Sequence, residues 1–130
     1  MPTAEGRLVL LVEDDQSGRE MYATALELSG LRVVQAHNGL QAFDKAIALR
    51  PDVIVTDLCI PGIDGLELAR RLRSDVRTHH IPIIGVTGYA TFVSEPERAT
   101  RAGCDCLLFK PCLPDLLQAE ITRRLEDGTS

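Results

Sequence analysis

Several short apolar runs of this sequence are each followed directly by a side chain that could take part in phosphoryl transfer. The acids Glu13 and Asp14 follow the first run, Asp57 ends a central run, and Thr87 and Lys110 follow two later ones. A carboxylate can act as a nucleophile and form an aspartyl phosphate. A metal ion and an ammonium group would offset charge on the transferring oxygens, and a hydroxyl would donate a hydrogen bond to them.

Each of these residues also has an ordinary structural explanation. A carboxylate after a strand is often the N-cap of the next helix, and a lone lysine such as Lys110 is usually solvated. Carboxylates that do meet repel each other, because two like charges about 4 Å apart interact by roughly 4 kcal/mol at an effective dielectric of about 20. A cluster therefore needs a cation, and the candidates are Lys110 and a divalent metal. Hard oxygen ligands favour Mg²⁺.

The stretch around Asp57 indicates how the chain positions these groups. Residues 53–55 form a β-branched run that is opened by Pro51 and is too short for a helix, so we expect a strand buried on both faces of a parallel sheet. This strand stops at Asp57, and a Pro-Gly turn follows. Ligands of open α/β sheets gather outside the carboxyl ends of the strands. Asp57 therefore stands where a site would be.

Strands and helices alternate five times along the chain with short connections. This pattern predicts right-handed crossovers and a three-layer α/β/α fold with a parallel sheet. The strand ends and their polar residues, including His37 after the second strand, then lie along one edge. The expected strands are Arg7–Val12, Leu31–Ala36, Val53–Asp57, Ile81–Val86 and Cys104–Phe109, and the expected helices are Ser17–Ser29, Gln41–Leu49, Asp64–Arg73, Ser94–Gly103 and Pro114–Leu125.

Apolar spacing and capping residues predict finer features of the helices. A capping box with Ser94 at the N-cap and Glu97 at N3 predicts the start of the fourth helix. Apolar residues at helical spacing predict the buried side of each of the first three helices. These residues are Met21, Ala25 and Leu28, then Ala42, Ala46 and Leu49, then Leu66, Ala69 and Leu72.

Composition favours a soluble globular domain. The chain has 130 residues and a net charge of −5 with scattered basic residues, which disfavours a nucleic-acid-binding surface. No apolar run approaches the roughly 20 residues that span a bilayer, and the first six residues do not begin a signal peptide. We therefore expect one cytoplasmic domain over residues 1–130, with its core at about 7–126, and no direct contact with nucleic acid or membrane.

Four cysteines raise the question of disulfides or zinc. Because nothing suggests export, we expect reduced thiols. Cys104 and Cys106 lack the C-x2-C spacing of zinc sites. They should share one face of the fifth strand as small buried hydrophobes. The adjacent rings of His79 and His80 should diverge in a solvated loop.

Taken together, these motifs make the sequence similar to a response regulator receiver domain of two-component signalling, of the chemotaxis-regulator type, over essentially its whole length. Each motif is weak alone, but all of them follow the expected strand ends in the right order. They are Glu13-Asp14, Asp57 with Ile60-Pro61-Gly62-Ile63-Asp64-Gly65, Thr87-Gly88 and Lys110-Pro111. The resemblance implies a flavodoxin-like (βα)5 fold with strand order 2-1-3-4-5.

The resemblance also implies a magnesium site. Arg19 favours Asp14 as the direct ligand, because members of this family usually carry an arginine five residues after the metal-binding aspartate. Asp15 is then expected to be a helix N-cap. The residues assigned to Mg²⁺ are Glu13 through a water, Asp14, Asp57 and Cys59 through its backbone carbonyl.

The remaining roles implied by the resemblance concern the phosphoryl group. Asp57 would be the phosphoacceptor, and Thr87 and Lys110 would hold the phosphoryl oxygens. The Lys110-Pro111 peptide would be cis. Leu107 departs from the family, which commonly has Tyr or Phe at this position as a switch residue. Tyr89 is a candidate substitute or a loop residue that shields the pocket.

As a function, the resemblance implies a signalling domain that catalyses only its own phosphorylation and dephosphorylation. A histidine kinase or a histidine phosphotransfer protein would donate the phosphoryl group to Asp57. The surface formed by the fourth helix, fifth strand and fifth helix would then signal to a downstream protein. Alternatives are a phosphate sink, or a receiver piece of a longer regulator or hybrid kinase. A flavin-binding protein and a pseudo-receiver that is not phosphorylated fit less well. The acidic loop after the first strand repels a cofactor phosphate, and the phosphorylation residues are intact.

Overall fold

The structure of the chain is a computed structural model that describes residues 6–60, 62–88 and 95–127. Ten helices and strands alternate along these residues. In order they are β1 (Leu8–Val12), α1 (Gln16–Leu28), β2 (Arg32–Ala36), α2 (Gly39–Leu49), β3 (Val53–Asp57), α3 (Gly65–Ser74), β4 (Ile83–Thr87), α5 (Glu97–Ala102), β5 (Cys106–Phe109) and α6 (Pro114–Asp127).

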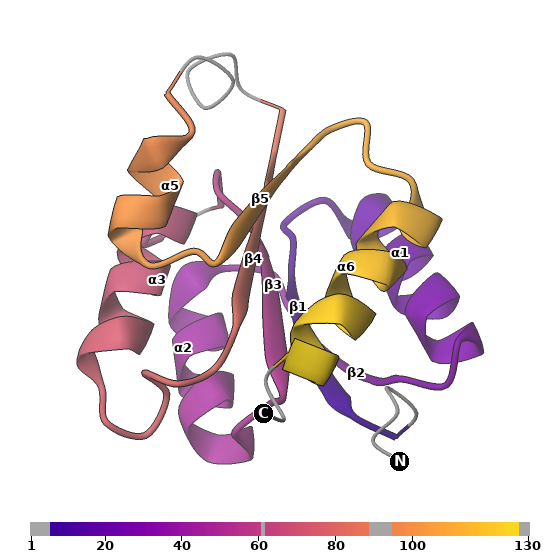
Figure 1. Ribbon diagram of the computed structural model, residues 1–130, viewed down its shortest axis with the longest axis horizontal. Coiled ribbons are helices and arrows are strands. Elements are labelled where there is room, and N and C mark those ends of the chain that lie inside the picture. The colour runs from indigo at the N-terminus through magenta and orange to yellow at the C-terminus, as the bar shows by residue number, and fades with distance from the viewer. Residues whose placement is uncertain (1–5, 61, 89–94, 128–130) are drawn as a thin grey trace.

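The five strands form one sheet in the order β2-β1-β3-β4-β5, and all four neighbouring pairs are parallel. Helices α2, α3 and α5 lie on one side of this sheet, and α1 and α6 lie on the other (Figure 1). The predicted three-layer fold and strand order are therefore confirmed. Parallel strands joined through helices need both faces of the sheet covered, which explains why β3 is buried along its whole length.

Two apolar clusters, one on each face of the sheet, form the core. Side chains alternate between the faces along a strand. Thus Ile54 belongs to the cluster under α2 and α3, whereas Val53 and Val55 belong to the cluster under α1 and α6. Within the described residues, no helix combines the length and the apolar character that crossing a bilayer requires.

Helix α1 turns a different side to the sheet than the spacing predicted. Met21 is 48% exposed and Leu28 is 84% exposed, so this prediction was wrong. Tyr22, Ala23 and Leu26 are buried instead. The helix offers two overlapping apolar stripes, and the buried stripe is the one whose aromatic residue finds both core packing and a hydrogen-bond partner for its hydroxyl.

The two cysteines near β5 lie on opposite faces of the sheet, so the prediction of a shared face was wrong. Cys104 packs in the α2 and α3 cluster, whereas Cys106 packs against the cluster under α1 and α6. The physical reason is that β5 begins at Cys106. The alternation of strand side chains therefore does not extend back to Cys104.

Three smaller predictions also need correction. Leu49, which was expected on the buried side of α2 with Ala42 and Ala46, is 48% exposed because it is the last residue of the helix. The rings of His79 and His80 do not diverge, because they meet edge to face with centroids 5.8 Å apart. The fourth helix along the described chain, α5, begins at Glu97, and its N-cap residue Pro96 forms no side-chain cap. Ser94, which was expected to cap this helix, lies outside the described residues.

The cysteines should differ sharply in reactivity. All four are free thiols, and Cys59 is exposed. Burial raises the pKa of Cys104 to about 11 and that of Cys106 to about 12, and burial also raises the pKa of Cys112. Because the thiolate is the reactive form, we expect one fast reaction with Ellman's reagent at pH 8 in the folded protein. Cys59→Ser should remove this phase, and a fast phase that survives the substitution would contradict the assignment.

Candidate functional site

The parallel register brings the ends of the strands to one edge of the sheet. Val12 is paired with Thr56, Asp57 with Val86, and Thr87 with Phe109. The residues that immediately follow β1 and β5, Glu13 and Lys110, therefore emerge beside Asp57 and Thr87, which end β3 and β4.

Lys110 forms ion pairs with two of the acids at this edge. Its Nζ lies 2.5 Å from Oδ2 of Asp57 and 3.1 Å from Oε1 of Glu13. Both acids are buried, whereas the lysine side chain is about one-third exposed. Burial opposes the charge on Lys110, but the hydrogen bonds that it donates to both carboxylates outweigh this effect and raise its pKa. The ammonium group thus stays protonated and offsets charge at the acidic site.

The protonation of Glu13 reflects competing effects. Burial raises its pKa. The backbone N–H of Asp15 and the ammonium group of Lys110 act in the opposite direction, while the charge on Asp57 again raises the pKa. A further cation beside Glu13 would favour the ionised form of this acid.

Glu13, Asp14 and Asp57 form a group of acids that could hold a metal ion. One carboxylate oxygen from each lies within 4.8 Å of the others, and Asp14 is exposed to solvent. A set of oxygen donors with one solvent-facing side suits Mg²⁺, which keeps several waters when it binds protein carboxylates. The residues present therefore fit the metal that the sequence led us to expect.

Both oxygens of the Asp57 carboxylate are engaged. Oδ1 accepts a hydrogen bond from the backbone N–H of Cys59 at 2.9 Å, and Oδ2 accepts one from Lys110. This contact places the backbone of Cys59 next to the carboxylate. The Cys59 side chain takes no part in this hydrogen bond, which the backbone N–H makes.

Hydrogen bonds from side chains of the loop and of α1 hold the loop between β1 and α1 in place. Asp15 is the N-cap of α1, as expected, and accepts a hydrogen bond from the N–H of Gly18. Its own N–H donates to Oε2 of Glu13 at 3.1 Å. Arg19 donates to the backbone carbonyl of Glu13 and to the side chain of Gln35. These contacts fix the backbone on either side of Asp14.

The loop between β3 and α3 returns closely against the end of β3. Asp64 caps α3 by accepting a hydrogen bond from the N–H of Glu67. The N–H of Gly65 donates to the carbonyl of Leu58, and a Cβ at Gly65 would lie 2.6 Å from the carbonyl oxygen of Asp57. The position therefore requires glycine for a close approach to the backbone of Asp57.

Thr87 and Lys110 are joined through their backbones. Thr87 is buried, and its carbonyl accepts a hydrogen bond from the N–H of Lys110 at 2.8 Å. The peptide bond between Lys110 and Pro111 is cis, as the resemblance implied. Leu107 is partly buried and packs against the α2 and α3 cluster. Tyr89, the suggested substitute for an aromatic switch at Leu107, lies outside the described residues.

Not every strand end joins the site. His37 is exposed after β2, and its backbone N–H is bonded to the side chain of Gln41. Among the described residues, the group of side chains that could hold a metal ion does not include His37. A contact that the sequence did not suggest links Tyr22 to the backbone of Cys112 beside Lys110. The hydroxyl of a buried tyrosine needs a hydrogen-bond partner, but the sequence does not indicate which group provides it.

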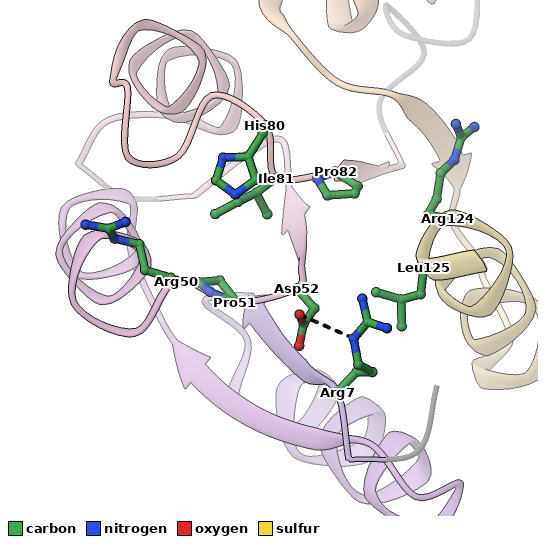
Figure 2. Close-up of a pocket in the computed structure, with 9 residues that line it drawn as sticks. All are labelled: Arg7, Arg50, Pro51, Asp52, His80, Ile81, Pro82, Arg124 and Leu125. Carbon is green, nitrogen blue, oxygen red and sulfur yellow. Dashed lines mark ion pairs between the residues drawn. The ribbon is translucent and has the colours of Figure 1, made fainter. Parts of the chain in front are cut away.

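A second hollow lies at the opposite edge of the sheet and has a volume of about 190 Å³ (Figure 2). Asp52 there is already paired with Arg7 at 3.3 Å and accepts the N–H of Leu8. The guanidinium groups of Arg50 and Arg124 point away from Asp52 in Figure 2. Among the described residues that line this hollow, Asp52 is the single acid, whereas three acids meet beside Lys110 at the other edge.

Comparisons with known proteins agree with the geometry of the site. The profile of the family described as "Response regulator receiver domain" matches residues 9–122. The polar-differentiation response regulator DivK of Brucella anthropi is 36% identical over 103 residues, which make up 79% of this chain and 83% of the relative. DivK of Brucella ovis is 34% identical over 103 residues, again 79% of this chain and 83% of the relative.

Solved structures give the same picture. The receiver domain of a sensor histidine kinase from Pseudomonas aeruginosa is 30% identical, with a TM-score of 0.85 over 93% of this chain and 98% of that chain. That structure has a magnesium ion coordinated in its active-site cleft. The chemotaxis response regulator CheY4 of Vibrio cholerae is 28% identical, with a TM-score of 0.85 over 92% of this chain and 98% of that chain.

Proposed function

This chain belongs to the response regulator receiver domain family, and from that premise we propose that Asp57 accepts a phosphoryl group from a phosphohistidine donor in a Mg²⁺-dependent reaction. The observation that carries the proposal is the meeting of Asp57 with Lys110 at 2.5 Å, beside Glu13 and Asp14. A nucleophilic carboxylate, a protonated amine and an oxygen-rich metal site are the groups that phosphoryl transfer to an acid requires.

In the proposed reaction, a carboxylate oxygen of Asp57 forms a bond to phosphorus as the P–N bond of the donor breaks. The electron pair of that bond leaves with the imidazole. Lys110, which now holds Oδ2 of Asp57, would transfer its hydrogen bond to a phosphoryl oxygen and offset the added charge. Thr87, buried at the end of β4, would hold another phosphoryl oxygen through its hydroxyl. The N–H of Cys59 would keep the carboxylate oriented during attack.

Magnesium would be held by Asp14 and Asp57 directly, by Glu13 through a water, and by the backbone carbonyl of Cys59. When bound, the metal ion supplies positive charge next to the oxygens of the transferring group. The acids lie within 4.8 Å of one another, a spacing that suits ligation of a single ion. The magnesium in the receiver domain from Pseudomonas aeruginosa supports this assignment by likeness.

Asp14→Asn should weaken magnesium binding roughly tenfold or more, because it removes a charged oxygen ligand and leaves the size of the side chain unchanged. The measurement is a calorimetric titration of the protein with MgCl₂. Asp15→Asn is the matched control, because Asp15 is an acidic neighbour whose side chain caps α1 and Asn also caps helices. If the Asp14→Asn variant and the unaltered protein bound Mg²⁺ with equal affinity, Asp14 would not be a metal ligand.

We propose that phosphorylation is read by a partner protein on the surface of α5, β5 and α6, the last three elements of the chain. Because the position of the common aromatic switch is held by Leu107, which packs in the core, the change would be transmitted by the strand and loop backbone next to Thr87 and Lys110. The chain would act as a signalling domain, and its chemistry would be limited to its own phosphorylation and dephosphorylation.

Phosphotransfer profiling against purified histidine kinases and phosphotransfer proteins tests this role. One donor should transfer phosphate to the chain much faster than the others. Beryllofluoride-activated protein, which stands in for the phosphorylated state, should then capture a partner that the untreated protein does not. Fast transfer without a partner that depends on activation would indicate a phosphate sink. Failure of every donor and of acetyl phosphate would reject the proposed function.

A further inference from the structure

A buried hydrogen bond ties α1 to the loop that carries the catalytic lysine. The hydroxyl of Tyr22 donates to the backbone carbonyl of Cys112 at 2.6 Å, and the two residues are 90 positions apart in sequence. Tyr22 is 9% exposed, so this bond is shielded from water. A buried hydroxyl that lost this partner would be left unsatisfied, which makes the contact a strong restraint on both segments.

The bonded carbonyl lies two residues after Lys110, in the segment between β5 and α6. On its other side, the backbone of Lys110 is bonded to Thr87. The lysine is therefore held between two backbone anchors, one from β4 and one from α1. Since Lys110 reaches both Asp57 and Glu13, a shift of this segment would move the ammonium group relative to the acids.

The ring of Tyr22 also lies close to the acids. It lines a narrow gap in the core together with Glu13, Asp57 and Leu117. Burial raises the pKa of Tyr22, and the negative charges of Glu13 and Asp57 act in the same direction, against the opposing effect of Lys110. The phenol thus stays protonated and able to donate to Cys112 throughout the neutral range.

We propose that Tyr22 is a positioning residue that sets the place of Lys110 through its hydrogen bond to the Cys112 carbonyl. The inference rests on the proposed function, since it concerns the rate at which Asp57 takes up phosphate. The ring of Tyr22 contributes to the core under α1 and α6. Its hydroxyl, in addition, would affect the rate at which Asp57 is phosphorylated.

The test compares Tyr22→Phe with Thr78→Val, using acetyl phosphate as donor so that no kinase contact enters. Tyr22→Phe keeps the ring and removes the hydroxyl. Thr78 is the matched control, because its buried hydroxyl also donates to a backbone carbonyl, that of Leu72 at 2.7 Å, in a loop after α3. We expect Tyr22→Phe to slow phosphorylation roughly five- to tenfold, as misplacement of a catalytic group does. Thr78→Val should leave the rate unchanged.

The same substitution in a Lys110→Met background separates positioning from general loosening. If Tyr22 acts through the lysine, Tyr22→Phe should have no further effect on the residual rate of that variant. Tyr22→Met, which also lacks the hydroxyl but fills the core with a flexible side chain, repeats the comparison if the phenylalanine variant folds poorly.

Three outcomes would overturn the inference. They are a Tyr22→Phe rate equal to that of the unaltered protein, an equal slowing by Thr78→Val, and the same fractional loss in the Lys110→Met background. These outcomes are distinct from failure of the proposed function, in which the unaltered protein itself takes up no phosphate.

Discussion

Asp57→Asn should abolish phosphorylation by acetyl phosphate in the presence of Mg²⁺, with an expected loss of at least about a thousandfold in rate. An amide is a far weaker nucleophile than a carboxylate, and it also gives up the ion pair with Lys110 that orients Oδ2. The amide oxygen can still accept the N–H of Cys59, so the loop should keep its place. The measurement is the mass of the intact protein after reaction, or incorporation of labelled phosphate.

Asp52→Asn is the control for this experiment. Asp52 is a carboxylate that also accepts a backbone N–H, that of Leu8, but it lies at the opposite edge of the sheet and is paired with Arg7. This variant should be phosphorylated at the same rate as the unaltered protein. If the Asp57→Asn protein took up phosphate as fast as the Asp52→Asn protein, Asp57 would not be the phosphoacceptor.

Gly65→Ala should both destabilise the fold and slow phosphorylation. The added Cβ would lie 2.6 Å from the carbonyl oxygen of Asp57 and 2.6 Å from Cα of Leu58, so backbone must move. We expect the free energy of unfolding to fall by about 1–3 kcal/mol, the usual range for overpacking. The phosphorylation rate should fall about tenfold, since the shift displaces Asp57, the proposed phosphoacceptor. Urea unfolding and acetyl phosphate labelling measure the two effects.

Gly18→Ala provides the comparison. Gly18 also lies in the first turn of a helix, but a Cβ there would meet only the end of the Asp15 side chain, at 2.9 Å. The Asp15 carboxylate, which caps α1 at the N–H of Gly18, must shift slightly, and the preference of alanine for the helix, up to about 1 kcal/mol, offsets the strain on this cap. Stability and rate should therefore change little. A Gly65→Ala protein as stable and as reactive as the Gly18→Ala protein would show that the close approach at Gly65 is not required.

The sequence alone could predict which side chains meet at one edge of the sheet, because strand ends are easy to locate. A β-branched run that stops at a carboxylate predicts both a strand and its carboxyl end, as at Asp57. Parallel pairing then requires Glu13 and Lys110 to arrive at the same edge, and the structure brings Lys110 within ion-pair distance of both Glu13 and Asp57. Alternating elements with short connections predicted the parallel sheet and its crossovers, whereas the strand order was implied by the resemblance to the family.

Features that depend on packing between elements were harder to predict. The buried side of α1 could not be chosen from spacing, because Met21 and Tyr22 lie on two overlapping apolar stripes and the choice depends on what α6 presents. The faces of Cys104 and Cys106 depended on where β5 begins, which pairing with β4 decides. The bond from Tyr22 to Cys112 joins residues 90 positions apart, and local sequence carries no signal of such a partner.

The most direct test of Asp57 as a magnesium-dependent phosphoacceptor is to locate the phosphoryl group chemically. Borohydride reduces an aspartyl phosphate to homoserine, which tandem mass spectrometry can assign to one position of the chain. After reaction with acetyl phosphate and Mg²⁺, homoserine should appear at position 57, and chelation of the metal should prevent its formation. Homoserine at another acid of the chain, or equal conversion at position 57 after chelation, would contradict a magnesium-dependent phosphoacceptor at Asp57.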